Sequence, residues 1–179
     1  MNVDKNSRVY YNKKRIPTVL VGIRGGNKMR LSTKGRYGLK AMFDLALHYG
    51  DGPISLKSVA ERQSISDHYL EQLIAGLRKA GLVKSVRGAQ GGYMLAENPS
   101  KITVGDIIRV LEGPLGPSDC VLEDEPTTCN NAECCVTRTV WEKIRVSISE
   151  VIDSITLQNM LDDYEKINHT NKDNFMYYI

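Results

Sequence analysis

All four cysteines of this 179-residue chain lie within sixteen residues, at Cys120, Cys129, Cys134 and Cys135. The spacing is C-x8-C-x4-C-C, and residues 113–134 contain three prolines and no helical or strand period. Thiolates bind iron and zinc, and they can be oxidised reversibly. No secretory signal pattern precedes them, so structural disulfides are not expected. The four thiols therefore predict a metal site or a redox site.

Three kinds of site are compatible with this cysteine loop. Zinc sites usually contain C-x2-C pairs, which the loop lacks. Iron–sulfur clusters accept wider spacings, because the cluster itself spans the distance between its ligands. Nearby thiols can also form a metal-free switch that closes a disulfide on oxidation. The spacing favours an iron–sulfur cluster, with a thiol switch or a zinc site as the alternatives.

The residues before the loop have the spacing of three helices. Apolar side chains recur at helical intervals between residues 39 and 49 and stop at the turn-forming residues 50–53. Ser55 and Ser66 stand where each would cap a further helix, and residues 63–65 make a tight connection between the two. Two helices joined in this way are typical of a helix-turn-helix.

A hairpin is predicted directly after these helices. Gly81 is placed to end the third helix, and short strand-like runs follow at 82–86 and 93–96. The residues between the runs, 87–92, include three glycines, as hairpin tips often do. This order predicts a winged helix-turn-helix. Residues 29–100 carry ten basic and six acidic side chains, and that charge favours DNA as the partner.

Three more helical segments are expected in the second half. Thr103 and Asp106 have the spacing of a capping box. Beyond the cysteines, apolar residues recur at intervals of 3, 4, 3 and 4, the pattern of a helix packed along a seam: Trp141, Ile144, Ile148, Val151 and Ile155. Such a helix can pack either against the core of its own chain or against the same helix of a second copy. Few other segments nearby could form a core with it, and this favours a homodimer. Thr156 is placed to cap a last short helix.

Composition and charge suggest four segments in a globular, cytoplasmic protein. No apolar run approaches the ~18 residues of a membrane span, and 25% of residues are charged. The scattered histidines form no nucleophile-and-base arrangement, so an enzyme is not expected. The segments are a disordered leader or non-native extension at 1–28, a DNA-binding domain at 29–100, a sensor loop with a dimerisation helix at 101–165, and a flexible tail at 166–179. The fold class is mainly α with a small β-hairpin wing.

Several stretches resemble the IscR-type family of winged-helix transcription regulators. They are Met29–Tyr37, Tyr69–Leu73, Leu77–Val83, Ser85–Gly88 and Gly91–Tyr93. The resemblance covers about residues 29–165 and makes Met29 similar to the family's own start. The family includes the iron–sulfur cluster biogenesis regulator, the nitric oxide sensor NsrR and the cysteine-metabolism repressor CymR. The resemblance implies a homodimeric bacterial repressor or activator that reads palindromic promoter DNA.

The resemblance also implies six DNA-facing positions, five at the start of the third helix and one in the wing. The helix enters the major groove in this family, where amide and carboxylate groups can read base edges. The wing touches the minor groove, which suits arginine. His68 stands where the cluster biogenesis regulator has a small hydroxyl residue, so the base preference would differ. The positions are Ser66, His68, Tyr69, Glu71, Gln72 and Arg87.

Family cluster ligands match Cys120, Cys129 and Cys135, and the cluster would be [2Fe–2S] or [4Fe–4S]. The biogenesis regulator's histidine ligand falls on Arg138, and the nitric oxide sensor's aspartate falls on Arg36, so neither can complete the site. The candidates for the fourth ligand are Cys134, Glu133, Asp119 and an exogenous group. The resemblance implies a repressor whose promoter affinity responds to iron status, oxygen or nitric oxide. CymR-like members lack the cysteines, and a thiol or zinc regulator, for example of cysteine metabolism, is the alternative.

Overall fold

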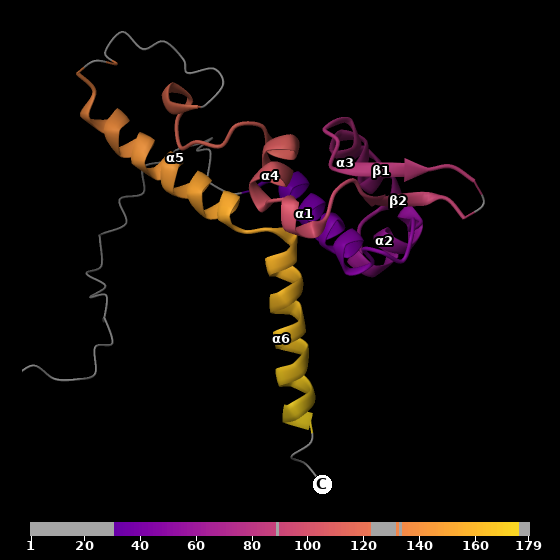
Figure 1. Ribbon diagram of the computed structural model, residues 1–179. Helices are drawn as coiled ribbons and strands as arrows, with labels where there is room; N and C mark the ends of the chain where they lie inside the picture. Colours follow the sequence, from indigo (N-terminus) through magenta and orange to yellow (C-terminus); the bar gives the residue numbers. More distant parts are fainter. Residues whose placement is uncertain (1–30, 89, 123–131, 133, 176–179) are drawn as a thin grey trace, which may run out of the picture.

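The computed structural model describes residues 31–88, 90–122, 132 and 134–175, and it is mainly helical (Figure 1). The leader at 1–28 therefore lies outside the described residues. The elements in chain order are α1 (Thr33–Leu47), α2 (Leu56–Gln63), α3 (Asp67–Lys79), β1 (Val83–Val86), β2 (Gly92–Leu95), η1 (Pro99–Lys101), α4 (Val104–Glu112), η2 (Asp119–Val121), α5 (Val136–Ser154) and α6 (Leu157–Phe175). Helices followed by a two-stranded hairpin confirm the predicted winged helix-turn-helix.

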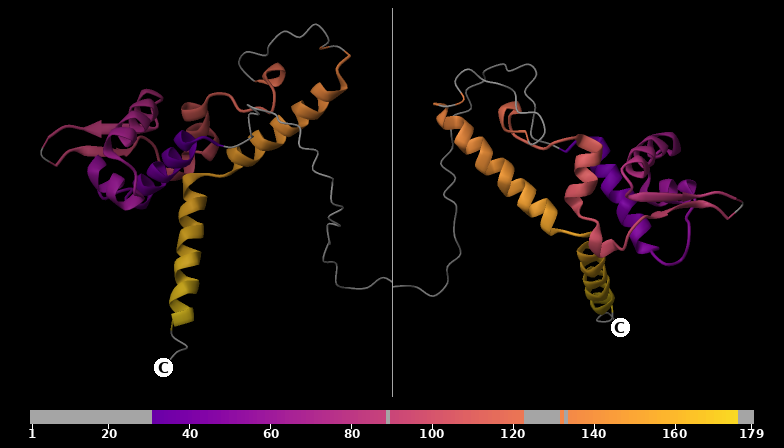
Figure 2. Two further views of the ribbon diagram at one scale, coloured as in Figure 1. Left: turned by 180° about the vertical axis from the view of Figure 1, so that it is seen from behind. Right: turned by 45° about the horizontal axis from the view of Figure 1, so that its top comes forward.

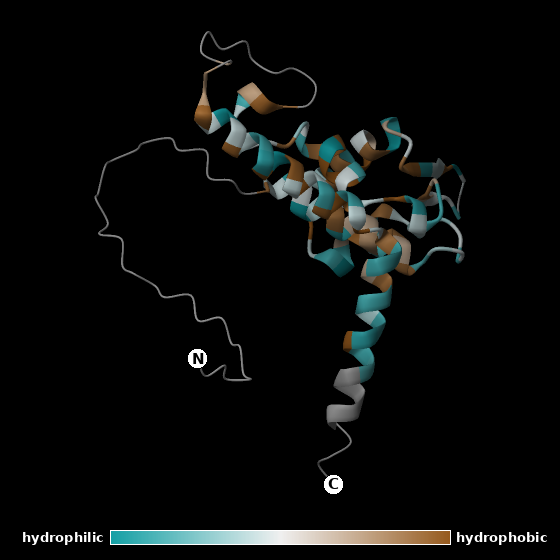
Figure 3. Cartoon of the chain, turned by 60° about the vertical axis from the view of Figure 1, so that its left-hand side comes forward, coloured by the Kyte–Doolittle hydropathy of each residue, from teal (hydrophilic) through white to brown (hydrophobic). Residues whose placement is uncertain are grey.

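The core is formed where α1, α2, α3 and α4 meet the hairpin. Figure 3 shows apolar residues gathered in this body, whereas α6 is mostly hydrophilic beyond it. Met42, Leu70, Leu77 and Ile107 are completely buried there. The helices therefore bury one apolar face each, as their spacing predicts.

Helices α1 and α4 pack closely because α1 lacks side chains at two contact positions. Cβ atoms placed on Gly35 and Gly38 would lie within 2.6 Å of Glu112 Oε1 and 2.0 Å of Leu111 Cδ1. The space left by Gly35 admits the carboxylate of Glu112, which accepts hydrogen bonds from the backbone N–H groups of Ser32 and Gly35. One end of α4 thus satisfies free amide groups at the start of α1.

The caps of α2 and α3 agree with the sequence except at one point. Ser55 accepts a hydrogen bond from the Ser58 amide, as predicted. Ser66 is the N-cap residue of α3, as predicted, but its side chain makes no capping hydrogen bond. The position of the cap is therefore confirmed, and the predicted capping bond is wrong. In the turn between the helices Ser64 has φ 53°, a left-handed conformation in which the amides of Ser64 and Ile65 close the end of α2.

The hairpin is attached to α3 by a Schellman motif and to the loop before α2 by a bridge. Gly81 has φ +80°, and the amide of Leu82 donates to the Leu77 carbonyl at 3.0 Å. The strands are β1 and β2, antiparallel, with Val83 opposite Leu95. Ile54 and Tyr93 exchange backbone hydrogen bonds of 2.9 and 2.8 Å, which fixes the wing against the helices.

We expect Gly92→Ala to destabilise the protein by about 2 kcal/mol, because the new methyl would overpack a backbone contact. A Cβ at Gly92 would lie 2.3 Å from the Ile54 carbonyl oxygen, so the bridge to the hairpin would have to open. Gly76→Ala is the matched control, since nothing lies within 4 Å of its Cβ position inside α3. It should stabilise the protein by about 0.5–1 kcal/mol. Urea unfolding followed by circular dichroism measures both, and equal midpoints would contradict the packing described.

The second half consists of two long helices that leave the body in different directions (Figure 2). The capping box of Thr103 and Asp106 is confirmed, with bonds of 2.9 and 3.0 Å. Thr156 caps α6 by accepting from the Asn159 amide. The prediction of a short last helix is wrong, because α6 runs to Phe175, into the segment assigned to a tail. Hydrogen-bonded pairs one turn apart, such as Gln158 with Asp162, support its exposed turns.

Candidate nucleic-acid interface and cysteine site

The outer face of α3 carries four of the five helix positions that the resemblance assigns to DNA. Ser66, His68, Glu71 and Gln72 are all exposed. His68 and Gln72 lie one turn apart, and the same face continues to Lys79. The opposite face holds the helix in the core through Leu70, Leu73, Ile74 and Leu77. This burial leaves the polar face of α3 free to meet a partner.

Tyr69 occupies a different environment from the other assigned positions. Its half-buried ring meets the ring of Tyr37 edge to face, with centroids 6.1 Å apart. Lys40 Nζ lies 5.9 Å from the centroid of the Tyr37 ring on the same helix, α1. The Tyr69 ring therefore helps to position α3 against α1.

Arg87 follows β1 directly and is exposed near the tip of the hairpin, which projects from the body (Figure 1). The wing is fixed relative to α3 by the Schellman motif and by Arg78, whose guanidinium donates to Ser85 Oγ at 3.4 Å. Arg87 and the outer face of α3 are thus held by one rigid unit.

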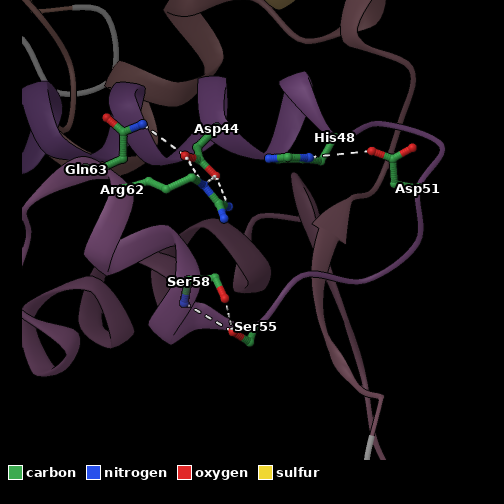
Figure 4. A network of polar contacts seen from close by, with 7 residues as sticks. All are labelled: Asp44, His48, Asp51, Ser55, Ser58, Arg62 and Gln63. Carbon is green, nitrogen blue, oxygen red and sulfur yellow. Dashed lines mark hydrogen bonds and ion pairs between the residues drawn. The ribbon is translucent and has the colours of Figure 1, made fainter.

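A buried carboxylate clamps the first two helices of this unit together (Figure 4). Asp44 of α1 is 1% exposed and accepts hydrogen bonds from Arg62 at 2.6 to 3.2 Å and from Gln63 at 2.9 Å, both on α2. The bond to Asp44 raises the pKa of Arg62 above its ordinary value. The sequence interpretation missed this clamp, although an acidic residue amid the apolar face of α1 was a visible signal.

The structure describes three of the four cysteines, two of them at the start of α5 and one on an element that contacts this helix. Cys120 lies on η2, which contacts α5, and Cys135 is the N-cap residue of α5 with exposed Cys134 just before it. Cys129 and Glu133 lie outside the described residues. No three ligating side chains of the described part are grouped around one point. A set of soft thiolate donors fits an iron–sulfur cluster chemically.

Cys135 has the surroundings of a reactive thiol. Hydrogen bonding to Thr137, whose Oγ1 lies 3.1 Å from Cys135 Sγ, lowers the pKa of the thiol, and the Arg138 amide and charge add to the effect. The amides at the start of α5 favour a negative charge at this position. A thiolate is the form that ligates metals and the form that is oxidised.

Thr137→Val should move the pH profile for alkylation of Cys135 in the metal-free protein to higher pH. The lowered pKa keeps the thiol ionised at lower pH, and loss of the hydroxyl removes the largest cause of that shift. Iodoacetamide labelling followed by peptide mass spectrometry measures the profile. Thr139→Val, at an exposed position without a bond to the thiol, is the control. Identical profiles for both variants would contradict the assignment.

Helix α5 presents an apolar face that nothing in the described part of the chain covers. None of its 19 residues is buried. A shallow groove of about 430 Å³ runs along it, lined by Lys143, Ile144, Ser147, Ile148, Val151 and Ile152. Three of the five predicted seam residues are in this groove, whereas Trp141 is half-buried outside it and Ile155 lies past the helix end. Three of the predicted seam residues therefore share one apolar face of α5, which is shorter than the predicted stretch.

The far end of α5 is locked to the start of α4. Arg109 of α4 donates two hydrogen bonds, of 2.6 and 2.8 Å, to the carboxylate of Asp153, and this bonding lowers the pKa of Asp153. Gly105 makes room for the carboxylate, since a Cβ there would lie 1.8 Å from Asp153 Oδ1. The Val104 amide also donates to the Ile155 carbonyl at 2.8 Å. Movement of α5 would therefore act on α4, which contacts both α1 and α3.

Comparisons with known proteins agree with this architecture. The Rrf2 family model, described as an iron-dependent transcriptional regulator, matches residues 31–163. The regulator CymR of Bacillus subtilis is 52% identical over 132 residues, which are 74% of this chain and 89% of CymR. The regulator IscR of Pectobacterium atrosepticum is 41% identical over 140 residues, 78% of this chain and 84% of IscR. Both are helix-turn-helix transcriptional regulators rather than enzymes, as the sequence predicts.

Among solved structures, T. potens IscR is 59% identical and superposes with a TM-score of 0.65, covering 77% of this chain and 90% of that one. No helix in the described ranges is both long and apolar enough to cross a membrane. The helix-turn-helix, the wing and these matches lead to one conclusion. The chain belongs to the Rrf2 family of transcriptional regulators.

Proposed function

We propose that this regulator represses transcription by binding palindromic promoter DNA as a homodimer, with an affinity set by an iron–sulfur cluster in the cysteine loop. The observation that supports the proposal is that Cys135 is the N-cap residue of α5 and Cys120 lies on η2, an element that contacts α5. The far end of α5 is joined through α4 to the helix-turn-helix. A ligand at the cysteines could therefore act on the DNA-facing elements through α5 and α4.

The DNA interface would consist of the outer face of α3 and the wing. His68, Glu71 and Gln72 are exposed on α3 and can reach base edges in a major groove. Exposed Arg87 suits the narrow, electronegative minor groove. The bond between Asp44 and Arg62 and the packing of Tyr69 on Tyr37 hold α2 and α3 against α1, and so position this interface.

Dimerisation would cover the apolar groove of α5. Ile144, Ile148 and Val151 recur along it at the spacing of a helix-pairing seam. A second copy of α5 presents the same face and satisfies two-fold symmetry. Two recognition helices related by a two-fold axis would then read two half-sites of a palindrome.

Cys120, Cys129 and Cys135 would hold the cluster, with Cys134 or Asp119 available as a further ligand. When bound, the cluster supplies a redox-labile group that oxygen, nitric oxide or iron shortage can remove. The Thr137 hydroxyl, with a further contribution from Arg138, lowers the pKa of Cys135 and so favours the thiolate, which is the ligating form. The cysteines would tie η2 to α5, and the Arg109–Asp153 pair would pass a shift of α5 to α4.

A cluster-free thiol regulator is the second candidate. The lowered pKa of Cys135 favours it, because a thiolate at a helix start is readily oxidised. The CymR relative also favours it, since a solved CymR is described as a global cysteine regulator. Such a protein would respond to oxidants without iron, and zinc bound to the same thiols would give a third behaviour.

Fluorescence anisotropy with duplexes selected from a randomised library tests the DNA-binding claim. The wild-type chain should bind selected duplexes more tightly than random ones, with an affinity that falls as salt rises. Arg87→Ala should weaken binding roughly tenfold, whereas Lys101→Ala, on η1, should leave it unchanged. Equal affinities for selected and random duplexes would refute a sequence-specific regulator.

A further inference from the structure

On the outer face of α3, the side chains of His68 and Gln72 are joined to each other. His68 Nε2 and Gln72 Nε2 are 3.2 Å apart, one helical turn from each other. Both side chains are exposed, while the buried face of α3 is made by other residues. The contact therefore contributes little to the core, and it lies where bases would be read.

The chemistry of the two nitrogens fixes the direction of this hydrogen bond. A glutamine amide nitrogen carries two hydrogens and only donates. In this contact His68 Nε2 therefore takes the role of the acceptor. One N–H of Gln72 is used in the pair, and the amide still has an N–H and its carbonyl oxygen to offer a partner.

The remaining pair of groups matches one base edge. A glutamine that presents one acceptor and one donor side by side pairs with N6 and N7 of adenine. If the amide were turned over, its oxygen would face His68 and its two N–H groups would face outward. That arrangement suits guanine, which offers two acceptors at O6 and N7.

We propose that His68 is a positioning residue that orients the Gln72 amide and so makes α3 select adenine over guanine at one base pair of each half-site. The inference rests on the proposed DNA binding by α3. The acceptor at His68 Nε2 is the feature that matters, because it holds the amide nitrogen on the side of the histidine.

Three substitutions at His68 test the role of the acceptor, because they leave an acceptor, only a donor, or no hydrogen-bonding group beside Gln72. His68→Glu offers only acceptors one turn from Gln72 and should retain the adenine preference. His68→Leu removes the acceptor, so the amide can turn over and the preference should fall below about twofold. His68→Lys supplies only a donor, which should draw the amide oxygen inward and reverse the preference toward guanine. The site is exposed, so thermal unfolding should be similar for all three.

The full chain and each variant are used to select duplexes from a randomised library, and the bound fractions are sequenced. Gln72→Ala identifies the base pair that Gln72 reads as the position whose preference it abolishes. The wild type should favour adenine over guanine there roughly tenfold. The inference is overturned if another base is favoured there, if Gln72→Ala changes no position, or if His68→Leu and His68→Lys keep the wild-type preference. A wild-type chain that enriches no sequence would instead overturn the proposed function on which the inference rests.

Discussion

Replacing Ile148 with aspartate should give a monomeric protein with roughly a hundredfold weaker affinity for its selected DNA. Ile148 lines the apolar groove of α5, and a two-fold pairing of α5 would bring one new carboxylate from each copy into the same seam. Burying ionised carboxylates without partners costs several kcal/mol each. A monomer reads only one half-site, so it loses the gain of binding two at once.

Val146→Asp is the matched control for this experiment. Val146 is an exposed apolar residue of α5, like Val151, but it does not line the groove. An aspartate there should leave both the dimer and the DNA affinity unchanged. Light scattering measures the mass, and anisotropy measures the affinity. A dimeric Ile148→Asp protein with normal affinity would show that α5 does not form the dimer seam.

Replacing Arg62 with methionine should lower the free energy of unfolding by about 2–3 kcal/mol. The substitution keeps the length of the side chain but leaves Asp44, which is 1% exposed, with Gln63 as its hydrogen-bond donor. Removing the cation from a buried ion pair strongly destabilises the folded protein, because the carboxylate is left buried without its partner. We place the effect at the lower end because 39% of the Arg62 side chain is exposed, so solvent screens the pair.

Lys57→Met is the control for Arg62→Met, since Lys57 is an exposed cation on the same helix. It should change stability by less than about 0.5 kcal/mol. The double variant Asp44→Leu with Arg62→Met should recover part of the loss, because no charge is then buried alone. Urea denaturation measures all three. A loss in Arg62→Met no larger than that in Lys57→Met would contradict the clamp.

Local signals in the sequence predicted the parts of the fold that local chemistry determines. The capping box of Thr103 and Asp106 and the helix end at Gly81 were both found, because each depends on residues within one turn. Glu112 reaching the start of α1 could not be predicted, since its partner Ser32 is 80 residues away. An acidic residue amid the apolar face of α1 could have indicated a buried pair at Asp44, but its partner Arg62, 18 residues on, could not be identified.

The functional surfaces divide in a similar way. The exposed positions of α3 follow from helical period once the buried face is known, so they could be predicted. Tyr69 could not be distinguished from them, because its ring is held by Tyr37 of another helix. The length of α6 was also missed, because its exposed turns depend on polar pairs and not on an apolar stripe.

Iron and acid-labile sulfide should be determined on the full chain purified without oxygen, together with its visible spectrum. We expect iron and sulfide in stoichiometric amounts, charge-transfer absorption, and loss of all three in Cys120→Ser and Cys135→Ser. DNA affinity should change when the cluster is removed by oxygen and should return on reconstitution. A wild-type chain that stays free of iron after reconstitution, or that holds zinc with unchanged DNA binding, would contradict control by an iron–sulfur cluster.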